Sequence, residues 1–391
     1  MKYSILFVCS LIISLAGCIK SEPLNAECDI LGASLPADIL NGAPVIKNNA
    51  VDFHVKLGAD VSALAPEFVL TPGATIEPAS GTVRDFTIPQ VYTVTSQDGQ
   101  WHKDYTVSAT DGYDDKLVYE YNFEHVAKKE TKTYTFDIFY EMNDRGEKDW
   151  EWATANSGFA MSGPGTMDNP APPSKFPTYQ GDNGMGGHCA VLQTVSTGPF
   201  GVTVNKPIAA GNLFTGTFNT LSAISKPLQA THFGEGRPFY KYPLYFRGTY
   251  KYTAGPVYTE FDANVDGKLV EVPGKQDQCN IYAVLFRTDD TFRYLDGSNV
   301  LAADNDHIIA TAEILPEERL TTDGWRTFGV PFTMRPGKSI DPVVLASGGY
   351  NMAIVASSSI EGDFFNGALG STLMIDRLEI YCLDQIPQTV E

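Results

Sequence analysis

Short strands dominate the pattern of hydrophobic and polar positions along the chain. The stretch VDFHVKL, from Val51 to Leu57, alternates apolar and polar residues, which is the period of a strand with one buried face. Further short apolar runs continue to about Ala109, and turn dipeptides such as Asp98-Gly99 separate them. Strands at this spacing predict a small immunoglobulin-like β-sandwich over residues 28–110.

A second and larger set of strands follows a polar linker at 111–116. Its candidate strands are LVYEYNFE, YTFDIFYE, HCAVLQTV, YPLYFRGTYKY, CNIYAVLFRT, DHIIATAEI, WRTFGVPF, YNMAIVASSS and STLMIDRLEIYC. Long loops rich in Gly, Pro, Asn and Asp separate them, and long helical periodicity is absent. This pattern predicts two sheets packed face to face, a jelly roll, over residues 117–384. The predicted fold class is therefore all-β.

One residue of the last strand conflicts with its alternation. With strict alternation, Met374, Asp376, Leu378 and Ile380 share one face, so Asp376 lies on a face that is otherwise apolar. An ionised carboxylate removed from water costs several kcal/mol unless it is paired or binds a metal. Two interpretations stay open. The carboxylate either caps backbone amides or pairs with a neighbouring Lys or Arg, or it binds a metal ion.

The first residues have the pattern of an export signal. Lys2 precedes an apolar run from Ile5 to Leu15, and LAGC ends at Cys18. This ending resembles the bacterial lipobox, which implies a signal peptide at 1–17, a lipidated Cys18 and a tether at 18–27. No aspartate follows Cys18 directly. We therefore expect an outer-membrane lipoprotein held by its lipid anchor, on the cell surface or on the periplasmic face.

The charge of the chain narrows the classes of partner. The formal net charge is −19 and no Lys/Arg cluster is present, which argues against nucleic acid and anionic lipid headgroups as partners. The sequence has no GxSxG, HExxH, P-loop or dinucleotide fingerprint, and no cysteine pair with zinc spacing. Outside the predicted signal peptide, which contains Cys9, and besides Cys18, the four cysteines at 28, 189, 279 and 382 allow three complete pairings, and their spacing selects none.

Several segments of the larger domain resemble one family of Bacteroidetes lipoproteins, that of the "putative carbohydrate metabolism domain". They are WATANSGFA, KPIAAGNLFTGTF, LQATHFG, YPLYFRGTYKYTAG, CNIYAVLF and YNMAIVASSSIEGDFFNGALGSTLMIDRLEIYC. The stretch GATIEPASGTVRDFTIPQVYTVTSQDG resembles the N-terminal immunoglobulin-like domains of Bacteroidetes surface lipoproteins. These resemblances imply a role in glycan utilisation, with a glycan or a glycan-processing outer-membrane protein as partner.

The jelly roll of that family is similar to galactose-binding-like carbohydrate-binding modules, which commonly hold a structural calcium where the first and last strands meet. The matching positions are Glu124, at the end of YNFE, and Asp376, at the end of MID. Calcium takes six to eight oxygen ligands, so backbone carbonyls would complete such a site. Arg377 stands where a second acid often follows, and the amide-capping interpretation of Asp376 stays open.

Sugar binding requires exposed aromatic rings with polar side chains beside them. Three loop segments combine these residue types: EKDWEWATANSGFA, FPTYQGDNG and HFGEGRPFYKYP. From them we predict the carbohydrate-binding residues Trp150, Trp152, Tyr179, Asp182, Arg237 and Tyr240. The alternative for each of these residues is a role in the core or in anchoring a loop.

Three functions are compatible with the sequence. The first is a non-catalytic glycan-binding lipoprotein in polysaccharide utilisation. The second is a glycoside hydrolase or lyase, which requires two carboxylates about 5–9.5 Å apart in a cleft. The third is a structural adhesin or assembly subunit, which requires exposed apolar edges or a large apolar patch.

Overall fold

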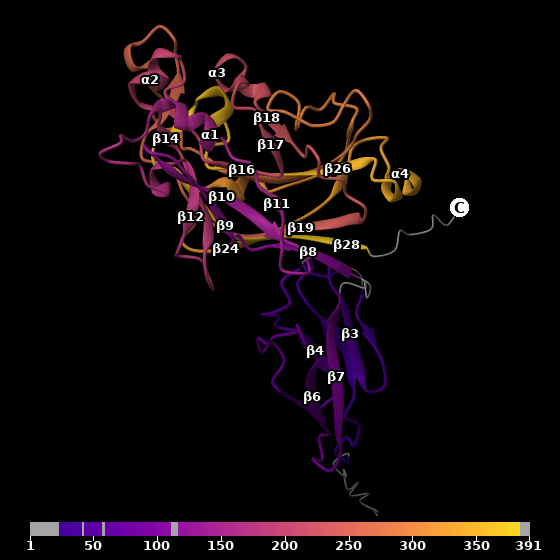
Figure 1. The fold of residues 1–391 in the computed structure, drawn as a ribbon. Coiled ribbons are helices and arrows are strands. Elements are labelled where there is room, and N and C mark those ends of the chain that lie inside the picture. Colours follow the sequence, from indigo (N-terminus) through magenta and orange to yellow (C-terminus); the bar gives the residue numbers. More distant parts are fainter. Residues whose placement is uncertain (1–22, 41–42, 57–58, 111–115, 384–391) are drawn as a thin grey trace, which may run out of the picture. The chain divides into compact units, whose positions relative to one another are not determined.

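The protein is described by a computed structural model that covers residues 23–40, 43–56, 59–110 and 116–383. The chain divides into two compact units with a boundary at Thr110 and Asp111. Both units consist mainly of strands, which confirms the predicted all-β sandwich class (Figure 1). The predicted signal peptide and Cys18 lie outside the described residues. Among the described residues, every helix falls short of the length and apolar character that a membrane span requires.

The first unit is a small sandwich of short strands. They are β1 (Ile30–Ser34), β2 (Val45–Ile46), β3 (Ala50–His54), β4 (Glu67–Leu70), β5 (Thr75–Glu77), β6 (Gln90–Thr95) and β7 (His102–Thr110). One sheet has the order β2-β3-β7-β6-β5, with β3 and β7 parallel, and β1 pairs with β4. Val51 and Phe53 are fully buried while Asp52 and His54 between and after them are not. The alternation in the sequence therefore identifies which residues of this strand belong to the core.

Two large sheets form the second unit. The six-stranded sheet contains β8 (Lys116–Tyr121), β12 (Thr178–Gly181), β13 (Cys189–Gln193), β19 (Tyr242–Thr253), β24 (Arg326–Pro331) and β28 (Thr372–Leu383). The five-stranded sheet contains β16 (Asn212–Phe214), β22 (Asn280–Arg287), β23 (Ile308–Glu313), β25 (Thr333–Met334) and β26 (Tyr350–Ser357). Their facing sides share one hydrophobic core, to which β19 contributes Phe246 and Tyr250 and β22 contributes Ile281 and Leu285.

The five-stranded sheet is buried on both faces. Strands β22 and β26 are buried at every residue except their last, which explains why their sequences are nearly continuous apolar runs rather than alternating ones. Tyr282, Val284 and Phe286 point away from the main core and form a second cluster with Phe233 and Leu295 from covering loops. Loops and short helices therefore cover the outer face of this sheet.

The covering segments contain short helices, and those at Asn156–Phe159, Gly198–Thr203 and Ser222–Ser225 lie well apart from the one at Pro342–Ala346 (Figure 1). The helices are α1 (Asn156–Phe159), η1 (Ala160–Ser162), η2 (Pro173–Lys175), α2 (Gly198–Thr203), α3 (Ser222–Ser225), η3 (Pro227–Gln229), η4 (Asp266–Lys268), η5 (Pro316–Arg319), α4 (Pro342–Ala346) and η6 (Gly362–Phe364). The remaining strands are β9 (Val126–Glu130), β10 (Thr135–Met142), β11 (Lys148–Glu151), β14 (Val195–Ser196), β15 (Ile208–Ala209), β17 (Gly216–Phe218), β18 (Thr231–Phe233), β20 (Tyr258–Phe261), β21 (Leu269–Glu271) and β27 (Gly367–Ala368).

The last strand, β28, contains a β-bulge at Asp376. On β19, Thr249 pairs with Arg377 and Tyr250 with Ile375, so Asp376 is the extra residue of this pair of strands. Leu373 and Ile375 before the bulge and Leu378 and Ile380 after it all reach the same core. The expectation of strict alternation was therefore wrong here. Asp376 does not share an apolar face, because the bulge moves it off that face.

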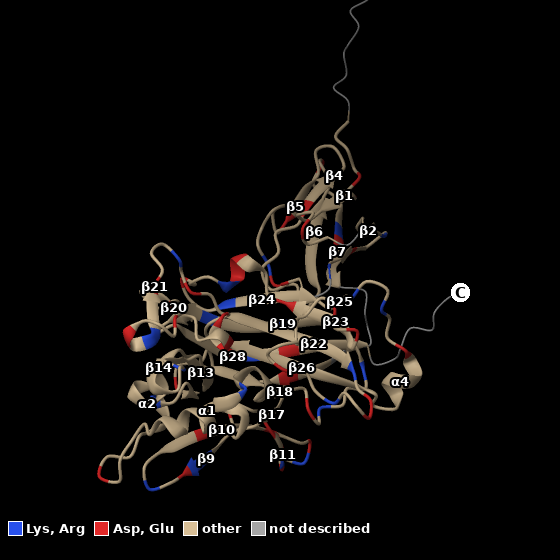
Figure 2. Cartoon of the chain, turned by 90° about the horizontal axis from the view of Figure 1, so that it is seen from above, with Lys and Arg blue, Asp and Glu red and all other residues tan. Residues whose placement is uncertain are grey.

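Charged residues and cysteines add little to the organisation of the fold. Lys and Arg are scattered among Asp and Glu over the described ribbon (Figure 2). The four described cysteines at 28, 189, 279 and 382 are all free.

Candidate functional site

The two predicted tryptophans lie together beside the main core. Trp150 is on β11, and Trp152 follows that strand, with ring centroids 5.1 Å apart. Trp152 is only 3% exposed, and its indole N–H donates to the Glu141 carboxylate at 2.7 Å. A ring buried to this degree offers no face to a sugar. The structure therefore does not support sugar stacking by Trp152, which has its alternative role as a core residue.

Arg237 joins the tryptophans from a distant loop. Its guanidinium carbon lies 4.2 Å from the centroid of the Trp150 ring, a cation–π contact. The Tyr121 ring packs against both indoles, at 6.0 Å from Trp150 and 5.3 Å from Trp152. We call Tyr121, Glu141, Trp150, Trp152 and Arg237 the tryptophan cluster. Three of its members, Trp150, Trp152 and Arg237, were predicted to bind carbohydrate. In the structure these side chains pack against one another.

Burial governs the charges of the tryptophan cluster. It raises the pKa of the Glu141 carboxyl to about 7, although the hydrogen bond from Trp152 acts in the opposite direction. Burial also lowers the pKa of Arg237, and the nearby Asp149 opposes that shift. The Arg237 Nε is buried without a hydrogen-bond partner among the described residues. This part of the cluster is therefore tightly packed rather than open to solvent.

The other predicted sugar-binding residues lie on separate segments. Tyr179 is half-buried on β12, where burial raises its pKa and the neighbouring Cys189 adds to the shift. Asp182 is exposed and lies 3.1 Å from Nδ1 of His188. Tyr240 is 52% exposed and its ring lies against Gly348. Carbohydrate binding by Trp150, Tyr179, Asp182, Arg237 and Tyr240 stays a prediction.

Glu124 and Asp376, the predicted metal ligands, hold the same glycine-rich loop. Asp376 accepts the backbone N–H of Met185 at 2.7 Å, and Glu124 accepts that of His188 at 3.0 Å. The bulged Asp376 therefore caps a backbone amide, as one of the two interpretations required. The loop is tight here. A Cβ on Gly184 would lie 2.5 Å from the His188 carbonyl oxygen and 2.8 Å from Asp376 Oδ1.

The donors around this loop have the chemistry that calcium prefers. Carboxylate oxygens of Asp376 and backbone carbonyl oxygens of Gly187 and His188 crowd around Gly184. The described residues contain no group of three or more His, Cys, Asp or Glu side chains that could hold a metal. A cation here would therefore depend on backbone carbonyls beside Glu124 and Asp376. Structural calcium stays a prediction.

A cavity of about 440 Å³ lies between the outer face of the five-stranded sheet and the covering helices. This volume is in the range of small-ligand pockets in proteins. Strands β16, β22, β23 and β26 supply one wall, and α1, α2, α3 and η6 supply the others. Its apolar lining residues include Phe159, Met161, Phe200, Val204, Ile208, Phe218, Ile224, Phe364 and Phe365.

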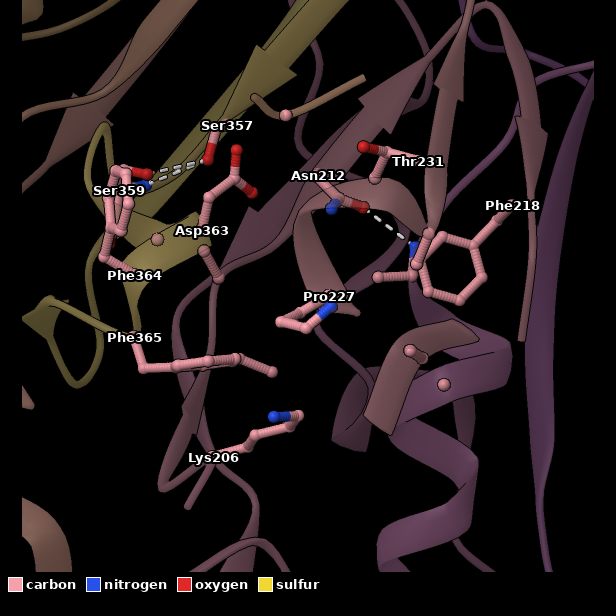
Figure 3. A pocket seen from close by; sticks show the side chains of 18 of the residues that line it. Lys206, Asn212, Phe218, Pro227, Thr231, Ser357, Ser359, Asp363, Phe364 and Phe365 are labelled. Carbon is pink, nitrogen blue, oxygen red and sulfur yellow. Dashed lines mark hydrogen bonds between the residues drawn. The ribbon is translucent and has the colours of Figure 1, made fainter. Parts of the chain in front are cut away.

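Asp363, on η6, brings a carboxylate to this cavity (Figure 3). No hydrogen bond or ion pair holds its side chain among the described residues. Burial raises the pKa of Asp363 to about 6, and the nearby charge of Asp296 adds to the shift. The side chain is exposed to the space of the cavity, and protein atoms surround that space. Its carboxylate is therefore available to a bound molecule.

Glu313 supplies a second carboxylate to the cavity lining, but it is already neutralised. Its Oε1 accepts hydrogen bonds from Asn280 at 2.8 Å and from the Arg319 guanidinium at 2.7 Å. Tyr282, beside Glu313 on the paired strand, has a pKa raised well above its usual value by burial and by Asp363 and Glu313. Glu313 therefore positions Asn280 and Arg319, while Asp363 remains unpaired.

Two buried polar atoms of the cavity lining lack partners. Asn280 and Thr231 are 4% and 5% exposed. The Asn280 Oδ1 and the Thr231 Oγ1 have no hydrogen-bond partner among the described residues. An unpaired buried polar group costs about 1–3 kcal/mol. Both residues line the cavity, but the two atoms themselves are covered by protein atoms.

Lys206 brings a positive charge to the cavity. Its ammonium lies 5.0 Å from the centroid of the Phe365 ring, and it forms no ion pair among the described residues. Burial lowers its pKa. Figure 3 shows Lys206 beside Phe365, with Asp363 in another part of the cavity.

The sequence interpretation did not find Lys206, Thr231, Asn280 or Asp363. They come from four distant segments, and none belongs to a recognised catalytic motif. One signal was available. The apolar runs CNIYAVLF and YNMAIVAS lack alternation, which indicates a sheet covered on both faces and hence a second layer where a pocket can form.

A family comparison matches the larger unit. The family model described as "Putative carbohydrate metabolism domain" matches residues 122–381. The chain belongs to this family. A second model, described as "SGBP, N-terminal", matches residues 37–109, and this abbreviation denotes surface glycan-binding proteins. The second unit is therefore a carbohydrate-related domain. The first unit matches the model for the N-terminal domain of Bacteroidetes surface glycan-binding proteins.

Two solved structures of family relatives resemble the chain. A protein of Bacteroides thetaiotaomicron, titled a "putative glycoside hydrolase", is 44% identical, with 94% of this chain and 100% of that chain covered and a TM-score of 0.59. A protein of Bacteroides vulgatus with the same title is 38% identical, with 67% of this chain and 97% of that chain covered and a TM-score of 0.58. No curated protein matches the sequence.

Proposed function

We propose that the second unit binds a glycan in the cavity on the outer face of its five-stranded sheet, and that the protein is a non-catalytic glycan-binding lipoprotein. One observation supports this proposal above others. The cavity combines aromatic walls with the Asp363 carboxylate, which has no hydrogen bond or ion pair among the described residues. Such a site offers stacking surfaces and hydrogen-bonding positions together.

The chemistry of the lining residues suits a sugar. Phe218 and Phe364 provide apolar surfaces on which the C–H face of a pyranose can pack. Asp363 can accept hydrogen bonds from ring hydroxyls, and charge-assisted bonds of this kind are the strong ones. The net charge of −19 favours neutral or weakly charged glycans over long polyanions such as sulfated ones.

The proposed cellular role follows from the N-terminal resemblance and the family. Lipidation of Cys18 would anchor the protein in the outer membrane, with the first unit as a spacer. Its partners would be the glycan itself and the glycan-processing proteins of the same membrane. The match of residues 37–109 to surface glycan-binding proteins supports the surface as its location.

A glycan array with the full chain tests the proposal. The array compares the parent protein with Asp363→Asn and Phe218→Ala in the cavity, and with Asp323→Asn as a matched acid-to-amide control at an exposed position outside the cavity. We expect the two cavity variants to lose about tenfold or more in affinity and the control to bind as the parent does. Binding that both cavity variants retain in full would contradict the proposed site.

Glycoside hydrolysis is the second candidate, because one observation favours it. The pKa of Asp363 is raised to about 6, which suits a general acid near neutral pH. The relatives described above have titles that name the same activity. Release of reducing sugar from array-positive glycans, lost in Asp363→Asn, would establish this function. Binding without release of product would support the non-catalytic role.

A further inference from the structure

Lys206 is a charged residue of the cavity lining for which the described residues supply no counter-ion. Its side chain is half-buried, and its ammonium lies 5.0 Å from the centroid of the Phe365 ring. Burial is the cause that lowers its pKa, and no carboxylate offsets that effect. A partly desolvated ammonium that has an aromatic ring beside it still lacks a counter-ion for its charge.

Asp363 does not serve as that counter-ion. The shift in its pKa comes from burial and Asp296, with no contribution from Lys206, and Lys206 shows none from Asp363. Opposite charges within about 4–6 Å would shift each other's pKa. The cavity therefore holds a positive and a negative group that are too far apart to pair, each open to a different part of a bound molecule.

We infer that the cavity recognises a glycan residue that carries a carboxylate, a uronic acid, with Lys206 as its counter-ion. This inference rests on the proposed function and specifies its ligand. A uronate carboxylate would give Lys206 a charge-assisted bond. The hydroxyls of the same or the next sugar would reach Asp363.

The overall charge limits how many acidic groups such a ligand carries. A protein with net charge −19 repels a long polyanion. A single uronic acid within or at the end of a mostly neutral glycan avoids that repulsion and still satisfies Lys206. The apolar lining also favours a carboxylate over a phosphate monoester, because the phosphate carries close to two negative charges near neutral pH and a larger hydration cost into the cavity.

The test is a titration of the full chain with 4-nitrophenyl β-D-glucuronide and β-D-galacturonide, followed by calorimetry. Each acid is compared with its methyl ester and with the matching neutral glucoside or galactoside. We expect at least one acid to bind about tenfold or more tightly than its ester. Lys206→Met should remove this preference, and Lys175→Met, at an exposed lysine outside the cavity, should retain it.

Unfolding of each variant is followed in parallel, so that a folding defect is recognised. Lys206→Met should be at least as stable as the parent, because it removes a desolvated charge. Equal binding of acid and ester, or a preference that survives in Lys206→Met, would overturn the inference. If neutral glycosides bind and Asp363→Asn weakens them, the proposed function stands without the inference. If no glycoside binds and the glycan array is blank, both fail.

Discussion

The tryptophan cluster and the cavity both gather aromatic and charged side chains from distant segments, but they differ in how these side chains are partnered. In the cluster, the Glu141 carboxylate accepts the indole N–H of Trp152. In the cavity, the Asp363 carboxylate has neither a hydrogen bond nor an ion pair among the described residues. The cations of the two regions are alike, since Arg237 lies over Trp150 and Lys206 beside Phe365. The carboxylates therefore distinguish the two regions.

This difference separates stability from recognition. Aromatic and charged residues that complete one another's contacts contribute to the folded state, whereas groups left without partners mark a place where another molecule can bind. Residue type alone does not distinguish the two regions, since both contain rings, a carboxylate and a cation. The following predictions test the distinction, from the largest expected effect to the smallest.

The largest expected effect is on the tryptophan cluster. Trp152→Ala should lower the free energy of unfolding by about 3–5 kcal/mol, because it removes a buried ring and leaves the Glu141 carboxylate without its indole donor. Urea denaturation followed by circular dichroism measures this change. The matched cavity variant Phe364→Ala, at a ring that is 59% exposed, should change it by less than about 1 kcal/mol. Equal losses of unfolding free energy in the two variants would contradict the proposed difference between the tryptophan cluster and the cavity.

The pH dependence of stability should report one carboxyl group in each region. The pKa of Glu141 is raised to about 7 and that of Asp363 to about 6 in the folded state. The protonated forms therefore favour folding, and this contribution is lost as the pH rises through those values. Thermal unfolding between pH 4 and 8 should show this decline. Glu141→Gln should flatten its upper part and Asp363→Asn its lower part. A profile unchanged in both variants would contradict these shifts.

A smaller effect is expected at the bulge. Asp376→Ala removes the acceptor of the Met185 N–H, which should cost about 1 kcal/mol in the free energy of unfolding. If calcium binds beside Glu124 and Asp376, calcium should raise the melting temperature of the parent relative to chelator, and Asp376→Ala should show no such rise. Asp182→Ala, on the exposed part of the same loop, is the control. A calcium response that persists in Asp376→Ala would exclude this site.

The smallest effect on stability is expected at the rim of the cavity. Phe200 is 43% exposed on α2, so Phe200→Ser should leave the free energy of unfolding within about 0.5 kcal/mol of the parent. Its effect should appear instead in glycan affinity, measured by calorimetry, since the ring lines the cavity. A variant that lost stability but kept full affinity would place Phe200 with the structural residues.

The fold could be predicted further from the sequence than the site. Alternation in VDFHVKL and the continuous run CNIYAVLF report burial directly, because each side chain's face is set by the period of the strand. The bulge at Asp376 escaped that reasoning, since it breaks the period through its pairing with β19. A pattern within one strand carries no information about register against its neighbour.

The site was harder to predict because its residues are related only through the tertiary structure. Trp150, Trp152 and Arg237 were predicted to bind carbohydrate from their residue types, whereas the burial of Trp152 in the core depends on the tertiary structure. Asp363 is the acid within the segment EGDFFNG, and its lack of a partner is visible only when the surrounding segments are in place. Whether a charge is paired depends on those neighbours, which are more than fifty residues away in the chain for Lys206 and Asp363.

The bulge in β28 also determines which insertions and deletions this strand can tolerate. Asp376 is the extra residue of the bulge, so a deletion of this position would leave a regular strand in which Leu378, Ile380 and Cys382 still face the interior. A residue inserted between Arg377 and Leu378 would instead turn these three side chains outward and their polar neighbours inward. The strand can therefore lose its extra residue more easily than it can gain another.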